Sequence, residues 1–186
     1  MPDHPDRLDA DDALLFVIDI QAKLLPAIHE ADAVVDACRL MIRAAGVFDM
    51  PIVLTEQYRK GLGPTVPGIA ELLEPVGVQP IDKVLFSGYT PEVRDALQAA
   101  GRSRIVVIGI ESHVCVQQTV LDLLRVDYKV WVCADAVGSR RPIDREMALH
   151  RMRQAGALVT TAESAIFELT RQAGTDRFKQ ILEIVK

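Results

Sequence analysis

The chain has 186 residues and a formal net charge of -5, with 49% hydrophobic and 25% charged residues. This length fits one domain, and we expect residues 1–186 to form a single domain with a sizeable core. The acidic balance argues against a nucleic-acid partner, because nucleic-acid-binding domains normally carry a basic excess or patch. The longest apolar runs, Ala13–Ile18 and Ile105–Ile110, are far shorter than the roughly 20 residues that span a bilayer.

The cysteines and the amino-terminal segment predict the cellular location of the protein. Cys38, Cys115 and Cys133 are an odd, sparse set without metal-ligand spacing, which suits a reducing environment better than a disulfide framework. The segment Met1–Asp12 is polar and acidic and lacks the apolar run of a signal peptide. We therefore expect a cytoplasmic protein with no membrane partner.

Short apolar or β-branched runs alternate along the chain with longer stretches of helical period. The short runs predict six strands, at Leu14–Asp19, Pro51–Thr55, Gln79–Lys83, Ile105–Ile110, Lys129–Cys133 and Leu158–Thr160. The longer stretches predict helices at Ala31–Ala45 (ending at Gly46), Ile69–Leu73, Pro91–Ala100, His113–Arg125, Ile143–Ala155, Ser164–Gln172 and Asp176–Val185. The Gly/Pro-rich stretch Glu56–Gly68 is longer than most connections in compact domains, which makes it a candidate functional loop.

Strands that alternate with helices predict right-handed crossovers and a parallel sheet. We expect an α/β fold: a three-layer sandwich with a doubly wound, mainly parallel six-stranded sheet in the order 3-2-1-4-5-6. In that order the first and fourth strands are neighbours at the switch point, where such sheets bind ligands beyond the carboxyl ends of their strands.

Three reactive residues fall at or just after the carboxyl ends of predicted strands. Asp19 ends the first strand, Lys83 ends the third, and Cys115 follows the fourth at the start of a predicted helix. A cysteine in a first helical turn feels the positive end of the helix dipole, which lowers its pKa and favours the thiolate. A nearby carboxylate can take the thiol proton and a lysine can hold the negative charges in place, which is the general arrangement of covalent catalysis. Taken singly, each residue also has a structural explanation: a buried core cysteine, a helix-capping aspartate and a surface lysine.

Three ordered blocks contain these residues: Leu15-Phe16-Val17-Ile18-Asp19-Ile20-Gln21, Lys83-Val84-Leu85-Phe86-Ser87 and Gly109-Ile110-Glu111-Ser112-His113-Val114-Cys115-Val116. They resemble the signature blocks of isochorismatase-like cysteine hydrolases, and the chain most resembles the isochorismatase domain-containing protein subgroup. The resemblance implies Asp19 as general acid/base, Lys83 as its electrostatic partner and Cys115 as nucleophile. It also implies a homo-oligomer, and an oxyanion hole from the backbone N–H groups of Glu111 and Cys115, after a cis peptide bond between Ile110 and Glu111.

Departures from the superfamily's patterns narrow the predicted chemistry. Nicotinamidases of this superfamily place an Asp-x-His metal site after the second strand, where this chain reads Thr55-Glu56-Gln57-Tyr58, and the Glu56–Gly68 loop has no histidine. We therefore expect no catalytic metal and no cofactor. Isochorismate-cleaving members typically lack the cysteine, so the resemblance favours cleavage of a C–N bond in a small amide, imide or carbamoyl compound through a Cys115 thioester. The alternative is an isochorismatase-fold binding or interaction module without turnover.

Other polar and aromatic residues are candidates for the surroundings of this site. Gln57, Tyr58 and Phe86 are candidate substrate-binding residues, since they lie beside the long loop and Lys83 in the sequence, although Phe86 is equally compatible with core packing. Gln21 is expected to make a structural hydrogen bond. Glu111 is compatible both with a role in the pocket and with exposure to solvent.

Two further residues compete with the proposed base. His113 lies two residues before Cys115, and residues i and i+2 of a helix do not face each other. Asp135, at the end of the fifth strand, lies one strand outward from the switch point, so a binding loop or a helix cap is the expected role. Cys38 and Cys133 are expected in the core.

Overall fold

A computed structural model describes residues 4–186, and the six strands found there form one sheet in the order β3-β2-β1-β4-β5-β6. Each neighbouring pair of strands is parallel. The strands are β1 (Ala13–Ile18), β2 (Ile52–Gln57), β3 (Pro80–Lys83), β4 (Arg104–Ile110), β5 (Lys129–Gly138) and β6 (Leu158–Thr160). The predicted fold class and strand order are confirmed, and β1 and β4 are neighbours.

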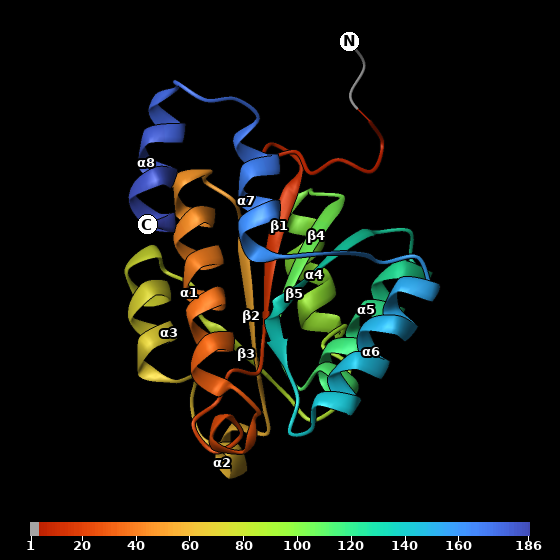
Figure 1. Ribbon diagram of the computed structural model, residues 1–186. Coiled ribbons are helices and arrows are strands. Elements are labelled where there is room, and N and C mark those ends of the chain that lie inside the picture. Colours follow the sequence, from red (N-terminus) through yellow and green to blue (C-terminus); the bar gives the residue numbers. More distant parts are fainter. Residues whose placement is uncertain (1–3) are drawn as a thin grey trace.

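Helices cover both faces of this sheet (Figure 1). They are α1 (Ala31–Val47), α2 (Arg59–Leu62), α3 (Pro67–Leu73), α4 (Pro91–Ala100), α5 (Gln117–Arg125), α6 (Pro142–Gln154), α7 (Ala162–Thr170) and α8 (Asp176–Val185). One face carries α1, α3, α7 and α8, and the other carries α4, α5 and α6. No helix within residues 4–186 is long and apolar enough to cross a membrane.

The strand β1 is buried on both faces and divides the core in two. Leu15 and Val17 belong to the cluster under α1, whereas Leu14, Phe16 and Ile18 belong to the cluster under α4, α5 and α6. This alternation follows from the two-residue period of a strand. It also explains why the strand reads as an unbroken apolar run in the sequence.

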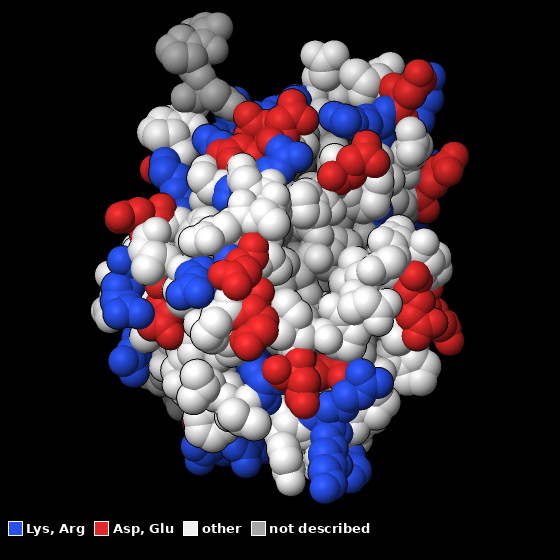
Figure 2. Space-filling model, turned by 180° about the vertical axis from the view of Figure 1, so that it is seen from behind, with Lys and Arg blue, Asp and Glu red and all other residues white. Residues whose placement is uncertain are grey.

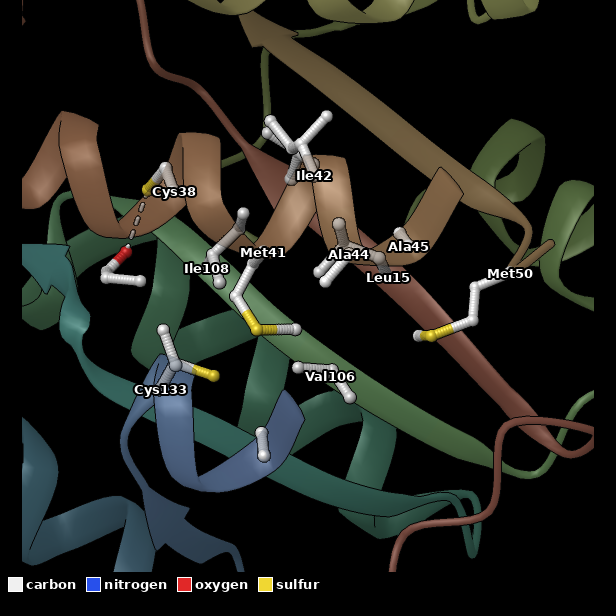
Figure 3. Packing of buried hydrophobic residues seen from close by; sticks show 14 of the residues in the cluster. Leu15, Cys38, Met41, Ile42, Ala44, Ala45, Met50, Val106, Ile108 and Cys133 are labelled. Carbon is white, nitrogen blue, oxygen red and sulfur yellow. Dashed lines mark hydrogen bonds between the residues drawn. The ribbon is translucent and has the colours of Figure 1, made fainter. Parts of the chain in front are cut away.

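Two of the three cysteines lie in the core beneath α1, as expected. Cys38 of α1 and Cys133 of β5 are fully buried, and Figure 3 shows them near Met41. The Cys38 thiol donates a hydrogen bond to the carbonyl oxygen of Ala136 over 3.2 Å. Cys38 and Cys133 are therefore packing residues in this structure.

The first helix runs past the glycine that was expected to end it. Gly46 lies inside α1, and the chain reverses at Asp49, which has a φ of 54°. Asp49 and Met50 donate backbone hydrogen bonds back to Gly46 and Ala45. Aspartate tolerates the left-handed conformation better than most residues, so it can take the place that glycine commonly occupies after a helix.

Three other predicted boundaries differ at the edge of the sheet where the strands end. The loop 56–68 is shorter than predicted because β2 continues to Gln57 and because α2 and the start of α3 lie within it. The predicted helix His113–Arg125 begins as a π turn at Ser112–Val116, and α5 follows it. The strand β5 extends to Gly138 through an irregularity in its pairing with β4. Polar Asp135 lies within this extension, which is why the apolar pattern seemed to end earlier.

Candidate active site

The sheet brings the three predicted catalytic side chains together at its carboxyl edge. Asp19 follows β1, Lys83 ends β3, and Cys115 lies in the π turn after β4. The Lys83 ammonium (Nζ) lies 2.7 Å from the Asp19 carboxylate (Oδ2), and Cys115 interacts electrostatically with both. Asp19 is completely buried, and Lys83 and Cys115 are 4% and 5% exposed. A buried acid, a buried cation and a thiol in mutual contact form the candidate site.

Asp19 is fixed by its backbone and by both carboxylate oxygens. It has a φ of 53°, and its N–H donates to the carbonyl oxygen of Thr55 over 3.1 Å. The Thr55 hydroxyl donates to Oδ1 over 2.8 Å, while Lys83 occupies Oδ2. Burial raises the pKa of Asp19, and the charge of Lys83 opposes this shift most strongly. A carboxylate with a raised pKa that stays beside a thiol is suited to accept a proton and return it.

Lys83 reaches its partner across the intervening strand. Besides Asp19, its ammonium donates to the side-chain oxygen of Gln57 over 2.6 Å and to the carbonyl oxygens of Leu85 and Phe86 over 3.3 and 3.2 Å. An ammonium group has three N–H donors, and four oxygens surround this one. Lys83 is therefore a fixed positive charge within the site, with no hydrogen left over for a bound molecule.

Cys115 departs from the electrostatic prediction made from the sequence. Burial, followed by the negative charge of Asp19, raises its pKa to about 12, although Lys83 acts in the opposite direction. The expected lowering of this pKa by a helix dipole was wrong, because burial and the negative charge of Asp19 outweigh any lowering influence. Cys115 lies in the π turn, which leads directly into α5. The resting side chain is thus a neutral thiol, and a nucleophilic thiolate forms only when the proton moves to Asp19.

The turn that carries Cys115 begins with the expected cis peptide bond between Ile110 and Glu111. Just before it, Gly109 has a φ of 128°, and a Cβ atom there would lie 2.1 Å from the carbonyl oxygen of Ile18. Only glycine allows β1 and β4 to approach so closely beside Asp19. The side chain of Glu111 is 13% exposed and pairs with Arg140, whose Nε lies 2.8 Å away. The oxyanion hole formed by the backbone N–H groups of Glu111 and Cys115 stays a prediction.

The three predicted substrate-binding residues surround Lys83, but they differ in their availability. The amide of Gln57 is occupied, since its oxygen accepts from Lys83 and its nitrogen donates to the carbonyl oxygen of Val84 over 2.9 Å. Tyr58 and Phe86 are 51% and 56% exposed. The backbone N–H of Tyr58 donates to the carbonyl oxygen of Lys83 over 2.7 Å. Their contact with a substrate remains a prediction, with Gln57 placed to orient Lys83.

Gln21 makes the structural hydrogen bonds that its position indicated. Its amide oxygen accepts from the N–H of Gln57 over 2.7 Å, and its amide nitrogen donates to the carbonyl oxygens of Gln57 and Gly63. Glu56 holds the same loop, because its carboxylate accepts from the N–H and the hydroxyl of Thr65. The loop 56–68 is thus attached to the ends of β1 and β2.

The residues that competed for the role of base have other partners. His113 Nδ1 lies 3.0 Å from the hydroxyl oxygen of Ser139. Asp135 accepts a hydrogen bond from the N–H of Ala162, the first residue of α7, which confirms its expected role at a helix end. Within residues 4–186 no group of three or more His, Cys, Asp or Glu side chains could hold a metal ion.

Sequence reasoning missed two hydroxyl groups of the site. The Thr55 hydroxyl binds Asp19, and the Thr119 hydroxyl donates to the carbonyl oxygen of Cys115 over 2.6 Å. Thr119 follows Cys115 by four residues, a spacing that places a threonine hydroxyl over the carbonyl of the preceding turn. That spacing was the signal available in the sequence. For Thr55 the signal was its place at the carboxyl end of the predicted strand Pro51–Thr55, which lies beside β1.

A cavity of 740 Å³ lies away from this site, between α1, β2, β3 and α4. Residues such as Pro51, Ile52 and Val78, near the amino ends of the strands, contribute to its lining. Figure 2 shows the face seen from behind, whose hollowed middle is mainly uncharged while residues of both charge signs surround it. The catalytic candidates, by contrast, lie at the carboxyl ends of the strands.

Comparison with known protein families shows to which family this chain belongs. The family described as Isochorismatase domain matches residues 13–164, which contain all three catalytic candidates. The chain belongs to the isochorismatase family. This confirms the resemblance on which the prediction of the site was based.

Isochorismatase-family relatives cover nearly the whole chain. Isochorismatase domain-containing protein 2A of Mus musculus is 40% identical over 183 residues, which cover 97% of this chain and 85% of the relative. The secreted isochorismatase effector Isc1 of Phytophthora sojae is 41% identical over 183 residues, which cover 97% of this chain and 87% of the relative.

Three solved structures have the same fold as this chain. The MAR1 ribonuclease of Caenorhabditis elegans has a TM-score of 0.89 and 38% identity, over 96% of this chain and 92% of that one. The ycaC gene product of Escherichia coli is described as an octameric hydrolase of unknown specificity. It has a TM-score of 0.91 and 27% identity, over 99% of this chain and 91% of that one. YcaC of Pseudomonas aeruginosa was solved with hexane-2,5-diol and covalent acrylamide. It has a TM-score of 0.88 and 27% identity, over 98% of this chain and 93% of that one. The chain is thus a hydrolase-like member of its family.

Proposed function

We propose that this chain is a cysteine hydrolase that cleaves the C–N bond of a small amide, imide or carbamoyl compound through a thioester at Cys115. The observation that carries the proposal is the buried contact of Asp19, Lys83 and Cys115 at the carboxyl edge of the sheet. Outside catalysis, a buried acid and cation beside a thiol are costly, because each charge loses its hydration. YcaC of Pseudomonas aeruginosa, a similar structure, was solved with covalent acrylamide. Nucleophilic side chains add to acrylamide at its vinyl carbon, so this finding supports a reactive nucleophile in such a fold and does not bear on the cleavage of an amide bond.

The first half of the reaction forms the thioester. Asp19 accepts the proton of the Cys115 thiol, and the sulfur attacks the carbonyl carbon of the substrate. The carbonyl π electrons move to the oxygen, which accepts hydrogen bonds from the backbone N–H groups of Glu111 and Cys115. Such donors are worth about 2.7–4 kcal/mol each at the transition state. Asp19 then gives its proton to the nitrogen, the C–N bond breaks, and the amine or ammonia leaves.

The second half of the reaction hydrolyses the thioester. Asp19 accepts a proton from a water molecule, whose oxygen attacks the thioester carbon. The C–S bond breaks, the sulfur regains the proton from Asp19, and the carboxylic acid leaves. Lys83 keeps its positive charge throughout the reaction and stabilises the negative charge on Asp19 or on the Cys115 sulfur. Its four oxygen acceptors hold the ammonium in this place.

The pKa directions of the free enzyme predict an unusual pH dependence. Activity requires an ionised Asp19, so kcat/KM should fall as the pH drops through the raised pKa of Asp19. On the alkaline side it should stay level until the pH nears the Cys115 pKa of about 12. A profile of kcat/KM between about pH 5 and pH 10, with circular dichroism to verify folding, measures this. An alkaline loss of activity near pH 8 or 9, where ordinary thiols titrate, would contradict it.

One observation favours the alternative of a binding module without turnover. The raised pKa of Cys115 means that the resting protein has no preformed thiolate. We nevertheless prefer the hydrolase, because Asp19, whose charge raises this pKa together with burial, is also the group that can remove the proton. A binding module has no need of a carboxylate in that place.

The test of the proposed function is a turnover screen. Wild-type protein is incubated with amides, imides, carbamoyl compounds and a short RNA, and the release of amine, acid or nucleotide is measured. We expect turnover of at least one C–N substrate, its loss in Cys115→Ala, and its retention in Cys38→Ala, which removes a thiol remote from the site. Full turnover in Cys115→Ala, or Cys115-dependent cleavage of RNA alone, would contradict the proposal.

We also propose that the chain forms a homo-oligomer, since the similar ycaC gene product of Escherichia coli is described as octameric. Light scattering at micromolar concentration tests this, and a monomer would contradict it. The cytoplasmic location stays a proposal that is based on the sequence. One relative, Isc1 of Phytophthora sojae, is by contrast named as a secreted protein.

A further inference from the structure

The hydroxyl of Thr119 connects two segments of the site that are distant in sequence. It donates to the carbonyl oxygen of Cys115 over 2.6 Å and accepts from the N–H of Gly88 over 2.7 Å. Thr119 is fully buried. The roles are fixed by chemistry, because a carbonyl oxygen only accepts, a backbone N–H only donates, and a hydroxyl has one hydrogen to give.

The two connected segments hold the nucleophile and the fixed charge. Cys115 belongs to the π turn, whereas Gly88 ends the stretch 84–88 that directly follows Lys83. Within that stretch the carbonyl oxygens of Leu85 and Phe86 accept from the Lys83 ammonium. One hydroxyl therefore joins the backbone around Cys115 to the backbone that holds Lys83.

The packing around this link is tight. A Cβ atom at Gly88 would lie 3.1 Å from the Thr119 hydroxyl oxygen and 3.0 Å from the ring of Phe16. The strand β1, which carries Phe16, ends next to Asp19. Gly88 is thus held between the strand that presents the base and the helix that follows the nucleophile.

We propose that Thr119 is a positioning residue that sets the distance between Cys115 and Lys83 through this double hydrogen bond; the proposal rests on the proposed function. A displacement of about 1 Å can reduce the rate of an enzyme by about 100-fold. Site residues held only by their own rotamers are easily displaced by that amount. The link therefore acts on catalysis without touching the substrate.

The chain contains a matched control for the test. Thr170 in α7 donates the same kind of hydrogen bond, four residues back to the carbonyl oxygen of Ile166 over 2.7 Å, and it is also buried. Thr170→Val removes this hydroxyl at a place remote from the site. Thr119→Val makes the same chemical change within the site, and Thr119→Ser keeps the hydroxyl and removes only the methyl group.

The experiment measures turnover, cysteine reactivity and stability in these variants. With an amide from the screen we expect kcat to fall by about 10- to 100-fold in Thr119→Val, with little change in KM, and to recover largely in Thr119→Ser. The pH profile of Cys115 alkylation by iodoacetamide, followed by peptide mass, should shift in Thr119→Val only. Urea unfolding should show a larger loss of stability in Thr119→Val than in Thr170→Val, because only Thr119→Val leaves a buried N–H, that of Gly88, without its acceptor.

Two results would overturn the inference: wild-type kcat and alkylation in Thr119→Val, or an equal loss of kcat in Thr170→Val. If Thr119→Val does not fold, Thr119→Ala against Thr119→Ser makes the same comparison, and equal values for the two would overturn it. The alkylation profile needs no substrate. A wild-type protein without turnover but with a Thr119-dependent profile would therefore contradict the proposed function and leave the link supported.

Discussion

In the variant Asp19→Asn we expect turnover to be lost while Cys115 becomes easier to alkylate. Burial, the negative charge of Asp19 and its side-chain hydrogen bond all raise the pKa of Cys115, whereas Lys83 lowers it. Asparagine removes the charge and leaves Lys83 in place, so the pKa of the thiol should fall. Each unit of decrease gives about tenfold more thiolate at neutral pH. The same change removes the base, and without a proton acceptor the substrate is not cleaved.

The rate of iodoacetamide labelling at about pH 7.5, assigned to Cys115 by peptide mass, measures this effect. The matched control is Asp135→Asn. Asp135 raises the pKa of Cys38 and Cys133 and is not among the causes of the Cys115 shift. We expect labelling of Cys115 at least about tenfold faster in Asp19→Asn, and at the wild-type rate in Asp135→Asn. Slower labelling in Asp19→Asn would show that Asp19 activates the resting thiol, contrary to the electrostatics described above.

Replacing Lys83 by methionine should destabilise the protein by about 3–5 kcal/mol at neutral pH, because it leaves a buried carboxylate without its cation. Lys83 is the main influence that lowers the pKa of Asp19, so in Lys83→Met that pKa rises further. A carboxyl group whose folded-state pKa lies above its unfolded value is destabilising when ionised. The loss in the free energy of unfolding is therefore largest at neutral pH. It shrinks as the pH falls toward the pKa that Asp19 has in the unfolded chain.

Urea unfolding at about pH 7.5 and about pH 5 tests this prediction. The double variant Asp19→Asn, Lys83→Met should recover much of the stability, because it contains neither charge. The control is Lys179→Met, which removes an exposed lysine 2.8 Å from Asp176 and should cost less than about 1 kcal/mol. Equal losses in Lys83→Met and Lys179→Met, or no recovery in the double variant, would contradict the assigned role of Lys83.

The sequence was sufficient for the fold and for the three catalytic candidates that the fold brings together, whose roles remain a prediction. The strands β1 and β4 (the latter after Arg104) are apolar along their length, which is typical of a sheet covered on both faces. Once their order is given, Asp19, Lys83 and Cys115 must meet at one edge. The end of α1 at Val47, with the reversal at Asp49, was harder to predict, because glycine takes the left-handed conformation after a helix more often than aspartate does.

The electrostatics of the site could not be obtained from the sequence. A dipole argument uses only the position of Cys115 along the chain, whereas its pKa depends on burial and on the place of Asp19, which comes from a different strand. The hydrogen bonds of Thr55, Gln57 and Thr119 likewise join segments that only the fold brings together. The sequence identified the reactive groups, and the structure identified what orients them.

The most direct test of the account is the mass of the peptide that contains Cys115 during turnover. Wild-type protein is mixed with the best amide of the screen, quenched in acid within seconds, and digested. We predict that this peptide gains the mass of the acyl group, and that Cys38 and Cys133 remain unmodified. Steady turnover with no acyl adduct on Cys115 at any quench time, together with undiminished turnover in Cys115→Ala, would contradict the account.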